Sequence, residues 1–251
     1  RVLRANLAQA GLGSRREALG AALEAGRMVG ELPFVWMRQG PRAAVRRVEV
    51  LGRDVVEHAC GEGRGVLYLT PHLGCFEVSA QVAALWGPIT VLYRPPHKSW
   101  LAALAAARLR PNLRTAPATA AGMRPLLRAL RNGEAVGLLP DQAPSAGEGV
   151  WALFFGRPAY TMTLPARLAQ LTGACIVLAF AERLPRGRGY RLHLRPLRRP
   201  LPDDAQQAAA SINAEIEELV RSCPRQYLWG YNRYKVPAGA PRPPRLQELA
   251  A

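Results

Sequence analysis

The chain has 251 residues, which is long enough for one large α/β domain or two small ones with a substantial buried core. Its 34 Lys and Arg residues outnumber its 18 Asp and Glu residues, and the resulting formal charge of +16 favours polyanionic partners: nucleic acid, anionic lipid head groups, phosphorylated substrates or an acidic carrier protein. No run of 18 apolar residues occurs, so no bilayer-spanning helix is predicted within these residues.

Four cysteines, Cys60, Cys75, Cys175 and Cys223, are widely separated and form no CxxC pair. This spacing predicts reduced, packed thiols and no zinc site.

The amino-terminal part, about residues 1–45, is predicted to be helical and basic. Ser14 followed by Glu17 has the form of a capping box, which predicts a helix start at this point. Leu19, Leu23 and Met28 then recur at helical spacing. This apolar stripe has two interpretations, packing on the domain or contact with a membrane, and packing is the more common role of such a stripe.

A short apolar run at residues 66–69 predicts a buried strand, and the amphipathic run from Phe76 onward predicts a helix. Between them, Pro71 fixes a turn or extended geometry and disfavours helical backbone in Thr70 before it. His72 therefore falls in the turn beyond the carboxyl end of a strand, where open α/β sheets place their chemistry.

His72 and Glu77 are five positions apart, and on one continuous helix they would point about 140° away from each other. They can meet only if His72 precedes the helix and Glu77 lies inside its first turns. A histidine oriented by a carboxylate on one ring nitrogen offers the other nitrogen as a general base. No serine or cysteine stands out as a nucleophile, so we expect a hydroxyl group of the substrate to attack. The alternative is a capping histidine and a solvated first-turn glutamate.

Further polar residues follow other predicted strands. Arg94 comes after the run at residues 89–93 and is predicted either to hold a phosphate or carboxylate or to form a surface ion pair. Asp141 and Gln142 follow the predicted strand at residues 135–139. Asp141 is expected to orient an arginine or bind the polar head of a substrate, and the alternative is a capping turn aspartate.

The carboxyl-terminal half begins with a Gly- and Pro-rich loop and an apolar stretch that contains Phe154 and Phe155. A long helix over residues 203–222 and a segment rich in aromatics and cations, residues 224–235, follow it. Because the sequence contains no linker or repeat, we predict one domain over residues 1–236, followed by a Pro-rich mobile tail at 237–251.

Five segments occur in an order that resembles a known family. They are TPHLGCFE at residues 70–77, YRPP at 93–96, LLPDQ at 138–142, FFGRPAYTMT at 154–163 and CPRQYLWGYNRYK at 223–235. Together they resemble the lipid A biosynthesis acyltransferases, the lauroyl and myristoyl transferase family of the lysophospholipid acyltransferase superfamily. The likeness extends from about residue 60 to residue 236.

The resemblance implies a glycerolphosphate acyltransferase-like α/β fold with a mostly parallel or mixed central sheet flanked by helices. It implies transfer of a fatty acyl chain from acyl carrier protein to a hydroxyl of a lipid A precursor, with His72 as base and Glu77 orienting it. Metal and cofactor are not required. The segment with Phe154 and Phe155 would line the acyl pocket, and the same phenylalanines also fit a core hairpin. Arg94, with Arg108 or Arg110, would hold anionic substrate groups, beside Asp141 and Gln142.

The resemblance also implies that acyl transfer takes place at the cytoplasmic face of the inner membrane, on an anionic surface. It further implies a membrane anchor upstream of Arg1. Two further acceptors, another glycolipid or a lysophospholipid, would need the same His and Glu. A basic nucleic-acid-binding protein is the alternative from another class, but no helix-turn-helix, zinc-finger or RNP pattern occurs, so no nucleic acid is expected. A scaffold that has lost catalysis is the third alternative.

Overall fold

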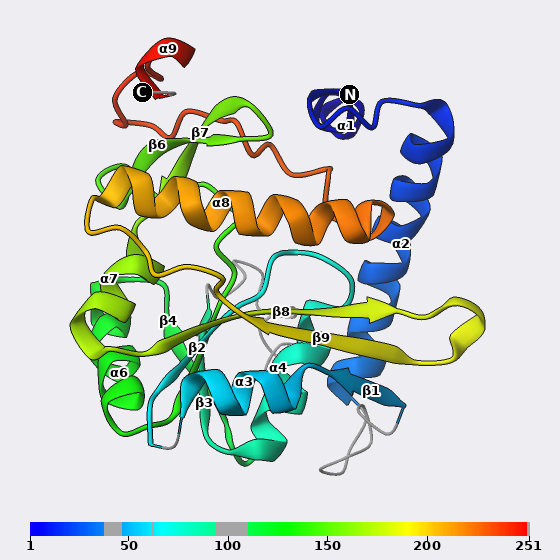
Figure 1. Cartoon of the computed structure of the whole chain (residues 1–251). Coiled ribbons are helices and arrows are strands. Elements are labelled where there is room, and N and C mark those ends of the chain that lie inside the picture. Colours follow the sequence, from blue (N-terminus) through cyan, green and yellow to red (C-terminus); the bar gives the residue numbers. More distant parts are fainter. Residues whose placement is uncertain (38–46, 62, 94–109, 250–251) are drawn as a thin grey trace.

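Strands from across the chain form a seven-stranded sheet within the residues that the computed structural model describes, 1–37, 47–61, 63–93 and 110–249 (Figure 1). Its order is β1-β9-β8-β2-β5-β3-β4. The strands are β1 Val48–Leu51, β2 Val66–Leu69, β3 Ile89–Tyr93, β4 Leu113–Pro117, β5 Ala135–Leu138, β8 Cys175–Arg183 and β9 Tyr190–Pro196. Only the β8–β9 pair is antiparallel among these, so the predicted α/β fold with a mostly parallel, mixed sheet is confirmed.

Helices cover both faces of the sheet because its central strands are apolar on both faces. In β8, even-numbered residues from 176 to 180 join one core cluster and odd-numbered residues from 177 to 181 join another, as the period of two requires. Helices α3 (Arg53–Cys60) and α4 (Phe76–Trp86) pack on one face, and α6 (Ala120–Arg131), α7 (Leu164–Thr172) and α8 (Ala205–Ser222) pack on the other (Figure 1).

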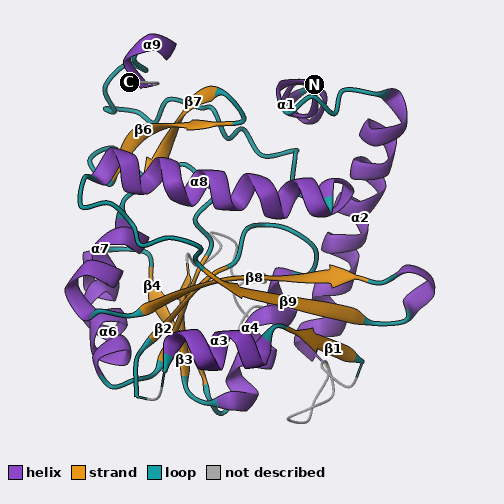
Figure 2. Ribbon diagram, in the orientation of Figure 1, coloured by secondary structure: helices purple, strands orange, loops and turns teal. Residues whose placement is uncertain are grey.

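A two-stranded hairpin, β6 (Gly149–Phe154) and β7 (Arg157–Met162), lies on the far side of α8 from the large sheet (Figure 2). The carboxyl-terminal segment, with the short helix α9 (Leu246–Leu249), contacts this hairpin, and the Trp151 indole donates a hydrogen bond to the Pro241 carbonyl at 3.0 Å. The predicted mobility of residues 237–251 stays a prediction.

The described residues of the amino-terminal part form two helices, α1 (Val2–Gln9) and the 23-residue α2 (Arg15–Met37). The Ser14 hydroxyl accepts a hydrogen bond from the Glu17 amide at 3.1 Å, which is one half of the predicted capping box. Two 3₁₀ turns, η1 (Pro185–Gly187) and η2 (Pro224–Gln226), are the remaining elements of the described ranges. Within the described ranges, no helix is both long and apolar enough to cross a bilayer.

Two features of the sheet could not be predicted from the sequence, the order of its strands and one strand at its edge. β5 pairs with both β2 and β3, so the strand before His72 and the strand before Arg94 are parallel but not neighbours. β4, Leu113–Pro117, was not predicted, because this edge strand lacks the period of two: its buried residues, Leu113 and Ala116, are three positions apart, and the other three are exposed.

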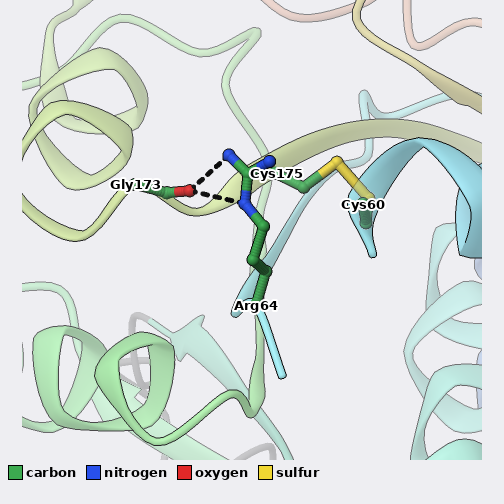
Figure 3. The surroundings of a disulfide bond; sticks show 4 residues. All are labelled: Cys60, Arg64, Gly173 and Cys175. Atoms are coloured by element: carbon green, nitrogen blue, oxygen red, sulfur yellow. Dashed lines mark hydrogen bonds between the residues drawn. A yellow bond between two sulfur atoms is a disulfide. The ribbon is translucent and has the colours of Figure 1, made fainter. Parts of the chain in front are cut away.

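A disulfide joins Cys60 at the end of α3 to Cys175 at the start of β8, with 5.3 Å between the Cα atoms (Figure 3). The prediction of reduced thiols is therefore wrong for this pair, whereas Cys75 and Cys223 are free. The two partners are 115 residues apart, and only the packing of α3 against β8 brings them together. Beside them, the Arg64 guanidinium donates two hydrogen bonds to the Gly173 carbonyl, at 2.8 and 3.2 Å.

Candidate active site

His72 lies in a tight turn between β2 and α4, as the sequence predicts. The Thr70 amide donates to the Leu138 carbonyl at 2.9 Å, which fixes the start of the turn against the end of β5. At its other end, Gly74 has φ +61°, and a Cβ there would lie 2.0 Å from the Ala181 carbonyl oxygen. Glycine is the residue that combines this backbone conformation with so close an approach.

The carboxylate at the His72 ring belongs to Asp141. Asp141 follows β5 and is 2% exposed. Its Oδ1 lies 2.8 Å from Nδ1 of His72, and its Oδ2 accepts a hydrogen bond from the His72 amide at 3.0 Å. Since β2 and β5 are parallel neighbours, the two residues meet at the shared carboxyl end of the sheet. Asp141 therefore fixes both the backbone and the ring of His72.

Asp141 and Gln142 together indicate the tautomer of the His72 ring, since an ionised carboxylate can only accept a hydrogen bond from Nδ1. Nε2 of Gln142 lies 3.1 Å from Nε2 of His72, and an amide nitrogen can only donate. Nε2 of His72 is then the acceptor, so the ring proton is on Nδ1 and is donated to Asp141. This tautomer, with Nδ1 held by a carboxylate and an unprotonated Nε2, is the arrangement of a general base.

The surroundings of Asp141 stabilise its charge. Burial alone would raise the pKa of Asp141, but the neighbouring His72 and the two hydrogen bonds from it outweigh burial and hold this pKa below its ordinary value. Burial raises the pKa of Tyr227, and the Asp141 charge raises it further. Burial lowers the pKa of Arg233, a nearby arginine that is 2% exposed, while Tyr227 and Asp141 oppose that shift.

The segment after α8, residues 224–235, docks on the His72 turn. The Leu228 amide donates to the His72 carbonyl at 3.0 Å, and the Gly74 amide donates to the Gln226 carbonyl at 3.0 Å. Nearby, the Tyr231 hydroxyl accepts from the Ala143 amide at 3.0 Å, one residue beyond Gln142. The aromatic segment thereby braces both strand ends that carry the site.

A cavity of about 680 Å³ opens beside His72, within the size range of ligand-binding pockets. Glu77 lines it from the first turn of α4 and is 6% exposed, so His72 and Glu77 share one cavity. The hydrogen bonds of His72 described above go to Asp141 and Gln142, and the predicted His72–Glu77 dyad stays a prediction. Other lining side chains are largely apolar and include Leu32, Trp36, Phe76, Leu92, Met123 and Leu164.

Comparison with known proteins decides the family. The model of the bacterial lipid A biosynthesis acyltransferases matches residues 21–236. The chain belongs to this family. It is 32% identical to the lipid A biosynthesis lauroyltransferase of Escherichia coli strain K12, over 84% of this chain and 69% of that protein. It is 30% identical to a lipid A biosynthesis acyltransferase of Haemophilus influenzae, over 73% of this chain and 58% of that protein. With the lipid A biosynthesis palmitoleoyltransferase of E. coli K12 it shares 32% identity, over 78% of this chain and 64% of that protein.

Membership of the lipid A acyltransferase family makes this chain an acyltransferase enzyme. The matched region includes the His72 turn, Asp141 and the aromatic segment, so the site lies wholly within the family's domain. Among the residues described, no group of three or more His, Cys, Asp or Glu side chains is arranged to hold a metal ion.

Other predicted site residues have different surroundings. Arg110 donates to the carbonyls of Val35 and Trp36 at 3.2 and 3.1 Å, at the end of α2. Arg94 and Arg108 lie outside the described residues. A cation that the sequence did not single out, Arg167 on α7, is exposed and lines the His72 cavity.

Phe154 and Phe155 do not line that cavity. They are 1% and 4% exposed and belong to the core, where Phe155 packs on the Trp229 ring with 5.6 Å between the centroids. The core-hairpin interpretation is thus confirmed, and contact with an acyl chain stays a prediction.

Proposed function

We propose that this chain transfers a fatty acyl group from an acyl carrier protein thioester to a hydroxyl of a lipid A precursor, with His72 as general base. The observation that carries the proposal is the His72–Asp141 pair, whose Nε2 faces a largely apolar cavity in a chain of the lipid A acyltransferase family. The cavity supplies room for an acyl chain, and the pair supplies the base that a hydroxyl acceptor needs.

In the reaction, Nε2 of His72 takes the proton of the acceptor hydroxyl while its oxygen attacks the thioester carbonyl carbon. The imidazolium that forms is stabilised by Asp141, which is ionised and already hydrogen-bonded to Nδ1. Collapse of the tetrahedral intermediate breaks the carbon–sulfur bond, and the departing sulfur receives the proton from His72. Glu77, on the same cavity wall, is a second carboxylate that favours the imidazolium.

The oxyanion of the intermediate needs hydrogen-bond donors. The amino-terminal end of α4 is suited to this role, because the aligned peptide dipoles of a helix place partial positive charge on its first amides. An arginine near the cavity is the alternative donor, and Arg167 is the described candidate.

The charge of +16 supports the expected partners. An acidic carrier protein, a phosphorylated glycolipid and an anionic membrane surface are all attracted to such a chain. We place the reaction at the cytoplasmic face of the inner membrane, where a carrier-protein thioester and a lipid acceptor meet. Arg94, Arg108 and Arg110 stay candidates for holding anionic substrate groups, and Gln142 for orienting the hydroxyl.

The test is acyl transfer from a panel of acyl carrier protein thioesters to a lipid A precursor, comparing the wild type with His72→Ala. A matched control is His193→Ala, because His193 also pairs with a carboxylate, Glu182, at 2.9 Å but lies outside the cavity. We expect a loss of at least about a hundredfold for His72→Ala and an unchanged rate for His193→Ala. Full activity in folded His72→Ala would contradict the mechanism. If the wild type acylates only another glycolipid or a lysophospholipid, the proposal that a lipid A precursor is the acceptor is contradicted.

A further inference from the structure

The three acidic residues of α2 all face the domain. They are Glu17, Glu24 and Glu31, seven residues apart, so they lie on one side of the helix. Glu17 accepts two hydrogen bonds from Arg225, at 2.8 and 3.0 Å. Glu24 and Glu31 both pair with Arg183 of β8. These ion pairs fix the rotation of α2 about its axis.

The opposite side of α2 is apolar and exposed. The outward stripe consists of Leu19, Leu23 and Met37, which are 64%, 58% and 61% exposed. Leu19, Leu23 and Met37 lie within about 40° of one another around the axis. The glycines between them, at positions 26 and 30, point the same way, and a Cβ on either would meet no atom within 4 Å. The stripe is about 27 Å long at 1.5 Å per residue.

The charges on the outward side are cationic. Arg15 and Arg16 precede the stripe and are exposed, and Arg27 beside it is 64% exposed although it also contacts Glu24. Because the glutamates face the domain and are paired, the exposed side of α2 consists of large apolar side chains bordered by arginines. An amphipathic helix lying in the interface of an anionic bilayer has this composition.

The same helix forms a wall of the candidate active site. Leu32 and Trp36, about 140° and 100° around the helix axis from Leu19 and Met37, line the cavity that contains His72. A surface held against the outward stripe would therefore lie one helix diameter, about 10 Å, from the cavity wall. Figure 1 shows α2 running along one side of the molecule. Its last turns reach a helix that covers the sheet, α4, where the Gln81 side chain donates a hydrogen bond to the Val35 carbonyl at 3.1 Å.

We propose that the outward stripe of α2 binds the surface of an anionic lipid bilayer, with the helix lying parallel to that surface. This inference rests on the proposed function, because a lipid acceptor resides in a bilayer and must reach the cavity behind α2. An acidic protein would be recognised chiefly through dense cations, whereas the stripe is chiefly apolar with cations at its border. The bilayer is thus the occupant that the composition favours.

The test is sedimentation of the purified chain with vesicles of phosphatidylcholine alone or mixed with phosphatidylglycerol. The stripe variant is Leu19→Gln, Leu23→Gln and Met37→Gln combined. Its matched control is Val55→Gln, Leu171→Gln and Val236→Gln, at positions 52%, 54% and 51% exposed in other parts of the surface. We expect the stripe variant to partition at least about tenfold more weakly onto the mixed vesicles and the control to bind like the parent.

Equal partitioning of the stripe variant and the control would overturn the proposal. It would also be overturned if the stripe variant lost self-association in sedimentation velocity, or binding to acyl carrier protein, while vesicle binding stayed unchanged. Because the vesicles carry no substrate, this result is independent of the reaction. A parent inactive toward every acceptor would contradict the proposed function instead. With a detergent-dispersed acceptor, the stripe variant should keep the parent's rate.

Discussion

The two ends of the central sheet are held by different interactions. At the carboxyl ends of β2 and β5, His72 and Asp141 are joined by hydrogen bonds, and the aromatic segment after α8 adds a backbone hydrogen bond to His72. At the amino ends, the disulfide between Cys60 and Cys175 joins α3 to β8, and Arg64 binds the Gly173 carbonyl.

This difference separates chemistry from stability along one sheet. Hydrogen bonds at the carboxyl end orient a titratable ring and leave one of its nitrogens facing a cavity, so they set reactivity. A covalent bond at the amino end restricts the unfolded chain and presents no base or nucleophile. Changes at the two ends should therefore affect activity and stability separately.

The largest effect is expected for Asp141→Asn. This substitution keeps the shape of the side chain but removes the charge that orients His72 and stabilises its imidazolium. Acyl transfer should fall about a thousandfold, with an unchanged circular dichroism spectrum. Glu77→Gln, which alters the other carboxylate of the cavity, should reduce the rate by a smaller factor. The reverse ranking would favour Glu77 as the partner of His72.

Removing the disulfide should lower stability without lowering activity. The loop that it closes spans 115 residues, and the Cys60→Ser, Cys175→Ser double variant should lose about 2–4 kcal/mol in the free energy of unfolding by urea. The rate of acyl transfer by the folded protein should be unchanged. Reduction by dithiothreitol should lower the free energy of unfolding of the wild type by the same amount and leave that of the double variant unchanged. If reduction does not change the stability of the wild type, the stabilising role of this disulfide is contradicted.

Gly74→Ala should lower both activity and stability, because Gly74 lies in the His72 turn and contacts β8 at Ala181. Gly156→Ala is the matched control, since Gly156 has a similar φ of +70° but open space around a Cβ. We expect about 1 kcal/mol of destabilisation for Gly156→Ala, from backbone strain alone. Gly74→Ala should cost about 3 kcal/mol and reduce activity, because the clash with the Ala181 carbonyl displaces the turn. Equal stabilities for the two variants would contradict the close packing of this turn.

The smallest effect concerns pH. The pKa of Asp141 is lower in the folded chain than its ordinary value, so its ionisation stabilises the fold above about pH 4, and this contribution is lost as the pH falls through the folded pKa. The difference in unfolding free energy between the wild type and Asp141→Asn should shrink accordingly in acid. Glu217 should have the opposite effect, because burial raises its pKa and its ionisation therefore destabilises the fold. The free energy of unfolding of Glu217→Gln should rise relative to that of the wild type as the pH rises from about 4. Parallel pH profiles would contradict both assignments.

The sequence predicted what depends on neighbouring residues. Pro71 marks the His72 turn, an apolar run marks the strand before it and an amphipathic run marks the helix after it, so the local geometry of His72 could be predicted. Asp141 was predicted as a polar residue at a strand end. Its partner was not, because the contact spans 69 residues and depends on β5 lying next to β2.

Long-range packing also explains one prediction that was wrong and one choice that the sequence left open. The spacing of cysteines cannot indicate a pair 115 residues apart, since the disulfide requires the α3 terminus to lie against the start of β8. The apolar pair Phe154 and Phe155 fits a ligand pocket or a core equally well from composition. The core position follows from where α8 and Trp229 pack, which no local pattern records.

The most direct test of the account is the protonation of the His72 ring, observed by ¹⁵N NMR of the histidine-labelled protein at pH 8. The chain has only four histidines, and comparison with His72→Gln assigns the ring signals. We predict a proton on Nδ1 and none on Nε2, with this preference lost in Asp141→Asn. A proton on Nε2 in the wild type would contradict the account, because the nitrogen facing the cavity could not then act as a base.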